Sequence, residues 1–132
     1  MILVDTNVVV DIVGNDPDWE RWSSGALDEA AATDTVAIND IVYAELSAGY
    51  SSVERLEADL RSLRLALASI PRGALFLAGQ AFRRYRGQGG VRENVLPDFF
   101  IGAHAAVEGA TLLTRDRRRI ETYFPTVTII SP

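Results

Sequence analysis

Four isolated carboxylic acids adjoin apolar runs in this sequence: Asp5, Glu45, Asp98 and Asp116. An acid in such surroundings is costly to bury unless another group pairs with it. Four carboxylates brought to one place would repel each other, and a hard divalent cation such as Mg²⁺ or Mn²⁺ relieves that repulsion because carboxylate oxygens suit it as ligands. A cation held in this way can activate water and brace a phosphate group. The acids therefore predict a metal-dependent nuclease.

Two of these acids also have an ordinary structural explanation as helix caps. Asp5 and Asp116 each follow an expected strand, and Asp is a favoured N-cap residue for the helix that comes next. An N-cap does not require the Thr6-Asn7 pair that follows Asp5, which favours a metal-ligand role there. For Asp116, the end of a buried strand and the nearby Thr114 favour the same role.

The other two acids are expected on helices. Asp98 follows Pro97 in a first helical turn, where an acid is common, but the apolar stretch 99–101 requires that it find a partner. Glu45 lies in the middle of its helix, and its spacing does not decide between an exposed position and a position in the site. From the residues alone, Glu45 stays open.

Several polar residues near these acids are candidates for supporting roles. Asn7 and Thr114 could hold a carboxylate or a metal-bound water through hydrogen bonds. Asp11 is interpreted as a surface acid or a supporting acid. His104, the only histidine, stands in an apolar helix, and we predict a structural role for it.

The charge is unevenly distributed along the chain. The net charge of −5 argues by itself against a nucleic-acid partner, but residues 1–60 carry −11 and residues 61–132 carry +6. Every cationic side chain is arginine, which binds phosphate oxygens through its planar fork. Four arginines are candidate RNA contacts, although pairing with nearby acids is the plainer explanation for most of them: Arg86, Arg115, Arg117 and Arg118.

The composition limits the classes of protein that the chain can belong to. Its 132 residues suit one domain, 1–132, and nearly half of them are apolar, enough for a sizeable core. The absence of cysteine excludes disulfides, thiolate zinc sites and thiol catalysis. With neither a signal peptide nor a long apolar run, we expect a soluble, cytoplasmic protein without a membrane segment.

Apolar patterns and turn residues predict the elements that position the acids. Strands are expected at 1–4, 35–38, 110–113 and 126–130, with a further short strand possible in the connection 69–73. Helices are expected after Asn7, from Asp16, behind Asp40 as N-cap, from Ser51 or Ser52 through Leu67, and over 74–86, 98–108 and 117–123. The stretch 52–86 is interpreted as a helical insertion.

Short apolar strands separated by helices indicate an α/β fold with a parallel sheet covered on both faces. Ligands gather at the carboxyl ends of the strands in such sheets. Asp5 and Asp116 follow strands, and the other two acids lie in early helical turns, so all four can face one cleft.

At these residues the chain resembles PIN-domain ribonucleases, specifically the VapC toxins of bacterial toxin–antitoxin pairs. Four stretches in order carry the resemblance: Leu3–Asp11 (LVDTNVVVD), Val42–Gly49 (VYAELSAG), Pro97–Ala105 (PDFFIGAHA) and Leu112–Asp116 (LLTRD). The similarity extends over essentially the whole chain. Relatives often carry Asn-Pro where this chain has Asn39-Asp40, a departure at a helix start.

The resemblance implies a three-layer α/β/α sandwich and Mg²⁺- or Mn²⁺-dependent endoribonuclease activity. It implies a catalytic set of Asp5, Glu45, Asp98 and Asp116, in which the three aspartates ligate the metal, and it makes Glu45 a member of that set. It also implies a homodimer and a VapB-type antitoxin that occludes the acidic site.

Three other functions agree with parts of the pattern. The acids do not exclude a structure-specific DNA nuclease, because the chemistry ignores the 2′-hydroxyl. A receiver-like phosphotransfer domain would want a lysine, and the chain contains none. A non-catalytic PIN-like interaction module would not need the complete set of four acids.

Overall fold

The computed structural model of the protein describes residues 1–90 and 95–132. The strands in these ranges are β1 (Ile2–Val4), β2 (Val36–Asn39), β3 (Ala66–Ala68), β4 (Thr111–Leu113) and β5 (Ile129–Ile130). The helices are α1 (Thr6–Val13), α2 (Glu20–Thr33), α3 (Asp40–Ser47), α4 (Val53–Ser62), α5 (Arg72–Gly87), α6 (Leu96–Glu108) and α7 (Arg118–Tyr123).

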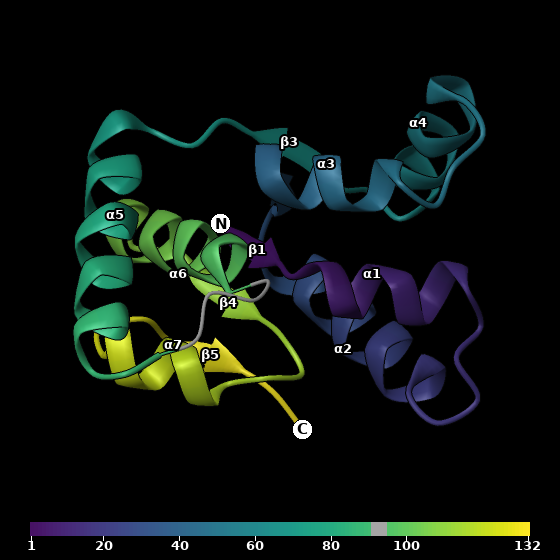
Figure 1. The fold of residues 1–132 in the computed structure, drawn as a ribbon. Helices are drawn as coiled ribbons and strands as arrows, with labels where there is room; N and C mark the ends of the chain where they lie inside the picture. Colours follow the sequence, from purple (N-terminus) through teal and green to yellow (C-terminus); the bar gives the residue numbers. More distant parts are fainter. Residues whose placement is uncertain (91–94) are drawn as a thin grey trace.

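The strands form one parallel sheet in the order β3-β2-β1-β4-β5. β1 lies at the centre, where Leu3 is opposite Ala37 on one side and Leu112 on the other. In Figure 1 the α5–α6 pair lies to the left of β1 and the α1–α2 pair to its right, so helices flank the sheet. The predicted α/β class with a parallel central sheet is confirmed.

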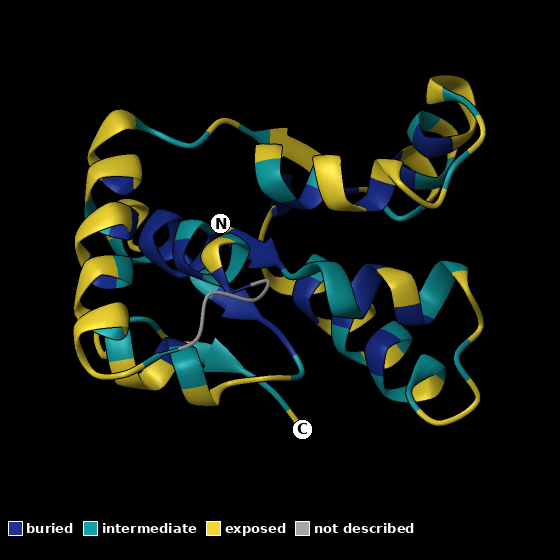
Figure 2. Ribbon diagram, viewed as in Figure 1, coloured by how far each residue is buried: buried dark blue, intermediate teal, exposed yellow. Residues whose placement is uncertain are grey.

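Burial explains why such short segments form the central strands. β1 is buried along its whole length, as are the last two residues of β4, and both strands are dark in Figure 2. The edge strand β3 is largely exposed. Central strands of a parallel sheet covered on both faces need apolar side chains on both faces, which is what the runs before Asp5 and Thr114 supply.

One predicted helix was too long. The apolar spacing from Val53 through Leu67 predicts a continuous helix, but α4 ends at Ser62 and Leu67 lies in β3. Arg64 has a left-handed backbone with φ of 59°, which ends the helical path and turns the chain toward the sheet. The stretch 52–86 therefore contributes an edge strand as well as helices, and Ser52 is the N-cap of α4, as predicted.

Two predicted helix starts also differ from the structure. The N-cap of α3 is Asn39 rather than Asp40, because the Asn39 carboxamide oxygen accepts bonds from the amides of Ile41 and Val42, each at 3.1 Å. α2 begins at Glu20, whereas Asp16 closes a turn before it by accepting two backbone hydrogen bonds.

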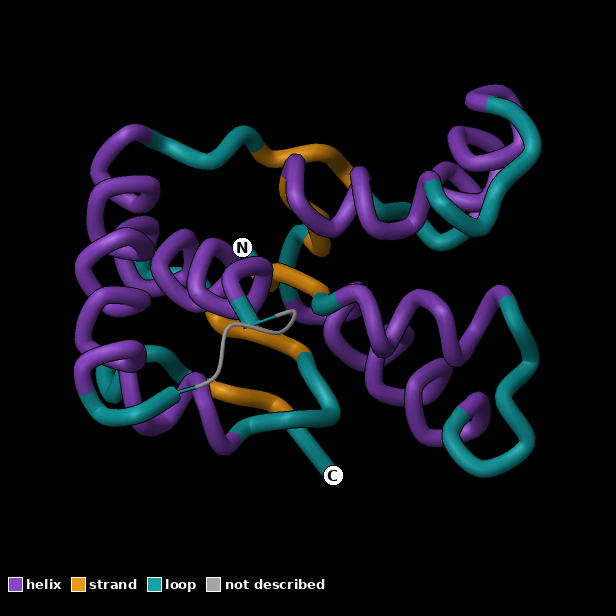
Figure 3. Tube along the Cα trace, viewed as in Figure 1, coloured by secondary structure: helices purple, strands orange, loops and turns teal. Residues whose placement is uncertain are grey.

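All five strands point the same way, so their carboxyl ends share one edge of the sheet. Figure 3 shows the short orange strands and the connections that leave them at this edge. None of the helices in the described residues is long and apolar enough to cross a lipid bilayer.

Candidate active site

Asp5 stands where β1 ends and α1 begins. Its backbone amide still bonds to the carbonyl of Leu113 in β4, at 2.9 Å, so the sheet fixes its position. Its carboxylate accepts from the amide of Thr6 at 2.7 Å, from the hydroxyl of Thr114 at 2.7 Å and from the carboxamide of Asn7 at 3.3 Å. Asp5 is therefore the N-cap of α1 and also the most heavily hydrogen-bonded of the four acids.

Asp116 lies in the segment after β4, two residues beyond Thr114, the position that corresponds to Asp5. The buried Thr114 joins the two strand ends, because its hydroxyl donates to Asp5 and accepts from the amide of Asp116 at 3.1 Å. The Asp116 carboxylate accepts from the amide of Arg118 at 3.3 Å, but α7 begins at Arg118 and its N-cap is Arg117, so the predicted start of this helix at 117, with Asp116 as its cap, is wrong by one residue. The supporting positions predicted for Thr114 and Asn7 thus lie in contact with Asp5.

Asp98 and Glu45 reach the same place from helices. Asp98 lies in the first turn of α6 and forms an ion pair with Arg119 of α7. Glu45 lies on α3 and accepts a hydrogen bond from the Thr6 hydroxyl at 2.6 Å, so a site contact settles the orientation that its spacing left open.

All four predicted acids line one cavity of about 380 Å³ at the carboxyl edge of the sheet. The rest of its lining comes from α1, from the loop after it, from α6, and from the segment that follows β4. Residues from four separate parts of the sequence thus share one space, as the position of parallel-strand ends predicts.

The acids interact electrostatically. The pKa of Asp5 is raised to about 6, mainly by burial; the charges of Asp98 and Glu45 add to the rise, and the hydrogen bonds from Thr114 and Thr6 oppose it. Burial likewise raises the pKa of Asp98, against the lowering effect of Arg119 and with the charges of Asp116 and Glu45 adding to the rise. This mutual repulsion is what a bound cation would relieve.

The donor set of this cavity fits a hard divalent cation, because every candidate ligand is a carboxylate oxygen. Within residues 1–90 and 95–132, however, no three His, Asp or Glu side chains are already arranged to hold a metal ion. A metal bound by Asp5, Asp98 and Asp116 would require side-chain rotations, including release of Asp98 from Arg119.

The arginines expected to contact RNA have different surroundings. Arg117 and Arg118 line a cleft of about 610 Å³ that shares Arg115, Asp116 and Arg119 with the acidic cavity. Arg117 also pairs with Glu121 at 2.7 Å, and Arg118 is exposed. Arg86 lines a separate hollow on α5.

Arg115, which is partly exposed, forms an ion pair with Asp11, a residue whose role the sequence left undecided. Asp11 is only 1 % exposed, and its carboxylate accepts from the Arg115 guanidinium at 2.8 and 3.1 Å. An acid between Val8-Val9 and Ile12 on an apolar helix was the signal that a buried partner exists. His104 is buried against Asn39, and burial lowers its pKa, in agreement with a structural role.

Comparison with known proteins identifies the fold. Residues 2–125 match the PIN domain family, a family of nucleases. A comparison with curated protein sequences gives no significant match.

Solved structures agree over the whole chain. A structure of VapBC2 from Rickettsia felis bound to a DNA fragment from its promoter is 26% identical, with a TM-score of 0.76, and the alignment covers 100% of this chain and 99% of that one. A toxin–antitoxin complex from Klebsiella pneumoniae is 21% identical, with a TM-score of 0.72 and coverage of 100% and 98%. FitAcB from Neisseria gonorrhoeae is 24% identical, with the same TM-score and coverage.

These matches confirm the resemblance on which the sequence analysis relied, including its VapC-type character. The family match extends over almost the full length and includes all four acids. The chain therefore belongs to the PIN domain family.

Proposed function

We propose that this protein is a Mg²⁺- or Mn²⁺-dependent endoribonuclease and the toxin of a VapBC-type toxin–antitoxin pair. The observation that carries the proposal is the shared cavity: Asp5, Glu45, Asp98 and Asp116 come from four segments and line one space at the strand ends. The charges of neighbouring acids help to raise the pKa of Asp5 and of Asp98, which is the electrostatic state that favours cation binding.

The bound cation would supply a water activated for attack on phosphorus and would offset charge on the phosphoryl oxygens. Asp5, Asp98 and Asp116 are the proposed ligands. Glu45, which is exposed and lines the cavity, is the proposed acceptor of a proton from the attacking water. Thr114 and Asn7 hold the Asp5 carboxylate in one orientation through their hydrogen bonds.

The substrate path is proposed to run from the acidic cavity into the cleft beside it. Arg117 and Arg118 line this cleft, together with the rings of Tyr85 and Tyr123. Guanidinium groups bind phosphate oxygens, and aromatic rings stack on unpaired bases, so the lining suits a single-stranded nucleic acid. RNA is the proposed substrate on the strength of the family resemblance.

A VapB-type antitoxin is the proposed partner. The similar structure from Klebsiella pneumoniae is described as a toxin–antitoxin complex, and the similar VapBC2 structure from Rickettsia felis is described as bound to promoter DNA. A groove of about 790 Å³ between α1, α3 and α4 adjoins the acidic cavity and shares Val10 and Glu45 with it. An antitoxin segment seated in this groove would reach the mouth of the cavity.

A homodimer is also proposed. The exposed apolar side chains of Leu75 and Phe76 stand on one end of α5, and Phe76 is 71% exposed. An apolar side chain exposed to this degree is commonly covered by a partner. Light scattering on the purified protein tests this proposal, and a monomeric mass at micromolar concentration would refute it.

The deciding experiment compares the wild-type protein with Asp5→Asn on matched single-stranded RNA and DNA oligonucleotides, with Mg²⁺, Mn²⁺ or a chelator. We expect RNA cleavage by the wild-type protein with either metal, none with chelator, and none by the variant. Cleavage of DNA alone would support the DNA-nuclease alternative. Undiminished metal-dependent cleavage by the variant would contradict the proposed role of Asp5.

A further inference from the structure

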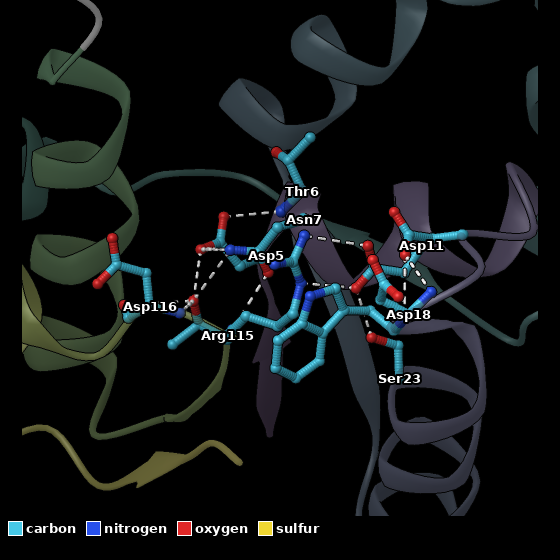
Figure 4. Close-up of polar contacts among 11 residues, drawn as sticks. Asp5, Thr6, Asn7, Asp11, Asp18, Ser23, Arg115 and Asp116 are labelled. Atoms are coloured by element: carbon cyan, nitrogen blue, oxygen red, sulfur yellow. Dashed lines mark hydrogen bonds and ion pairs between the residues drawn. The ribbon is translucent and has the colours of Figure 1, made fainter.

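Both the backbone and the side chain of Arg115 form hydrogen bonds with side chains on one face of α1. Its backbone amide donates to the Asn7 side-chain oxygen at 3.2 Å, while its guanidinium donates to both oxygens of Asp11, from Nε at 2.8 Å and from Nη2 at 3.1 Å. Figure 4 shows Arg115 reaching across to these two side chains. Asn7 and Asp11 are four residues apart, so they lie one above the other on the helix surface.

The carboxylate that binds the Arg115 guanidinium is itself held in place. Asp11 is buried, and the hydroxyl of Ser23 in α2 donates to the same carboxylate at 2.7 Å. The Arg115 guanidinium also lies over the ring of Trp19, 4.9 Å from its centre. These contacts hold the planar guanidinium in one orientation. A lysine ammonium could not donate to both carboxylate oxygens in this geometry and stack on the indole ring.

The backbone of Arg115 connects two residues of the candidate site. Thr114 precedes Arg115 and donates to Asp5, whereas Asp116 follows it and lines the acidic cavity. Displacing Arg115 would therefore move Asp116 relative to Asp5.

We infer that Arg115 is a positioning residue: its clamp to Asn7, Asp11 and Trp19 fixes Asp116 against Asp5, and it does not bind the nucleic-acid backbone. The inference rests on the proposed function, since it assigns Asp116 to the metal site. Arg115 and Arg118 both line the neighbouring cleft, but the Arg115 guanidinium is bonded to Asp11 and partly buried, whereas Arg118 is exposed. The positive charge of Arg115 is already balanced by a buried carboxylate.

The test uses Arg115→Lys, which keeps the charge but loses the fork, and Asp11→Asn, which keeps the shape but loses the charge. Matched controls are Arg21→Lys and Glu29→Gln, both at exposed positions on α2. Calorimetry measures Mg²⁺ binding to the RNA-free protein. Cleavage of a fluorogenic RNA at saturating Mg²⁺ gives kcat and KM, and circular dichroism checks the fold.

We expect Arg115→Lys to weaken Mg²⁺ binding and lower kcat by about tenfold each, with KM within about twofold of the wild-type value. Asp11→Asn should change the same two quantities in the same direction, and the two controls should change neither. Should Arg115→Lys fail to fold, Asp11→Asn decides, because its carboxamide keeps the volume and one acceptor oxygen for Ser23 but loses the charge and the second acceptor for Arg115.

Two results would overturn the positioning role. A raised KM with unchanged Mg²⁺ affinity would mean that Arg115 contacts RNA, and a loss of thermal stability alone would mean that the clamp only holds the fold. A wild-type protein that neither binds Mg²⁺ nor cleaves RNA refutes the proposed function itself. If the wild-type protein binds Mg²⁺ and cleaves RNA, and Arg115→Lys matches Arg21→Lys in both measurements, only the positioning role of Arg115 is refuted.

Discussion

Arg119 donates a hydrogen bond from its guanidinium to the carboxylate of Asp98, so one acid of the cavity already faces a cation that the chain itself supplies. The two side chains are 29% and 36% exposed, which leaves this ion pair open to water and to exchange. A divalent ion that binds Asp98 must displace the guanidinium. Arg119 therefore competes with the metal in the proposed mechanism.

The first prediction follows from this competition. Replacing Arg119 with Gln should tighten Mg²⁺ binding to the RNA-free protein, because Asp98 would no longer be paired. Partly exposed ion pairs contribute up to about 1 kcal/mol, which corresponds to roughly a fivefold change in affinity. Calorimetric titration measures the change, and Arg61→Gln on the exposed face of α4 is the control. Weaker binding in Arg119→Gln would instead mean that Arg119 supports the site.

The second prediction concerns the Thr114 hydroxyl, whose hydrogen bond lowers the pKa of Asp5. Thr114→Val keeps the shape but removes this bond, so the pKa of Asp5 should rise and the acid limb of the pH–rate profile should move to higher pH. Cleavage at neutral pH should fall by about 10- to 100-fold, the usual effect of losing such a supporting contact. Thr114→Ser keeps the hydroxyl and should retain the wild-type profile. An unshifted profile in Thr114→Val would contradict the prediction.

The third prediction uses the raised pKa of Asp5, about 6 in the folded protein. A carboxyl with a raised folded-state pKa holds its proton more tightly in the folded chain than in the unfolded one. Metal-free stability should therefore fall as the pH rises from about 4 to about 6 and stay lower above that range. Asp5→Asn removes this effect.

Chemical denaturation in the presence of a chelator measures it. The free energy of unfolding of Asp5→Asn, relative to the wild-type protein, should be greater at pH 7.5 than at pH 4 by about 1–3 kcal/mol. An equal difference at the two pH values would mean that Asp5 is already ionised near its ordinary pKa.

The fourth prediction tests the arginine cleft. Arg118→Glu should weaken RNA binding and reduce the slope of log affinity against log salt concentration by about one, because one phosphate contact is lost. Mg²⁺ binding should not change. Arg21→Glu, on the exposed face of α2, makes the same charge reversal away from the cleft and should leave the slope unaltered. Equal slopes for the two variants would remove Arg118 from the substrate path.

The fifth prediction concerns the packing that holds α6, and with it Asp98, against α7. A Cβ atom at Gly102 would lie 2.4 Å from the Phe124 ring, so Gly102→Ala should destabilise the protein by about 1–3 kcal/mol. Gly79→Ala in α5 meets nothing within 4 Å and should stabilise by up to about 1 kcal/mol through helix propensity. Thermal denaturation compares the two, and a matching loss in both would point to a general effect of glycine replacement.

The sequence was sufficient to predict the parts of the site that parallel-sheet geometry dictates. Asp5 and Asp116 follow buried strands, and neighbouring parallel strands bring their carboxyl ends together whatever their separation in the chain. Thr114 and Asn7 could be predicted because they are close to these acids in the sequence.

Contacts between distant side chains could not be predicted in this way. The Asp11–Arg115 and Asp98–Arg119 pairs join segments that only the folded structure brings together. The spacing of Leu60, Leu63 and Leu67 suits a helix, but pairing with β2 places Leu67 in a strand. A short edge strand buries too little apolar surface to leave a clear pattern in the sequence.

The pairing of β1 with β4 also sets when the site can form during synthesis. The ribosome makes the chain from its amino end, so Asp5 is synthesised long before β4, which begins at Thr111. The pairing of β1 with β4 cannot form until that segment has been made. On the proposed function, a nascent or prematurely terminated polypeptide that lacks this segment carries Asp5 and Glu45 but cannot cut the messenger that encodes it.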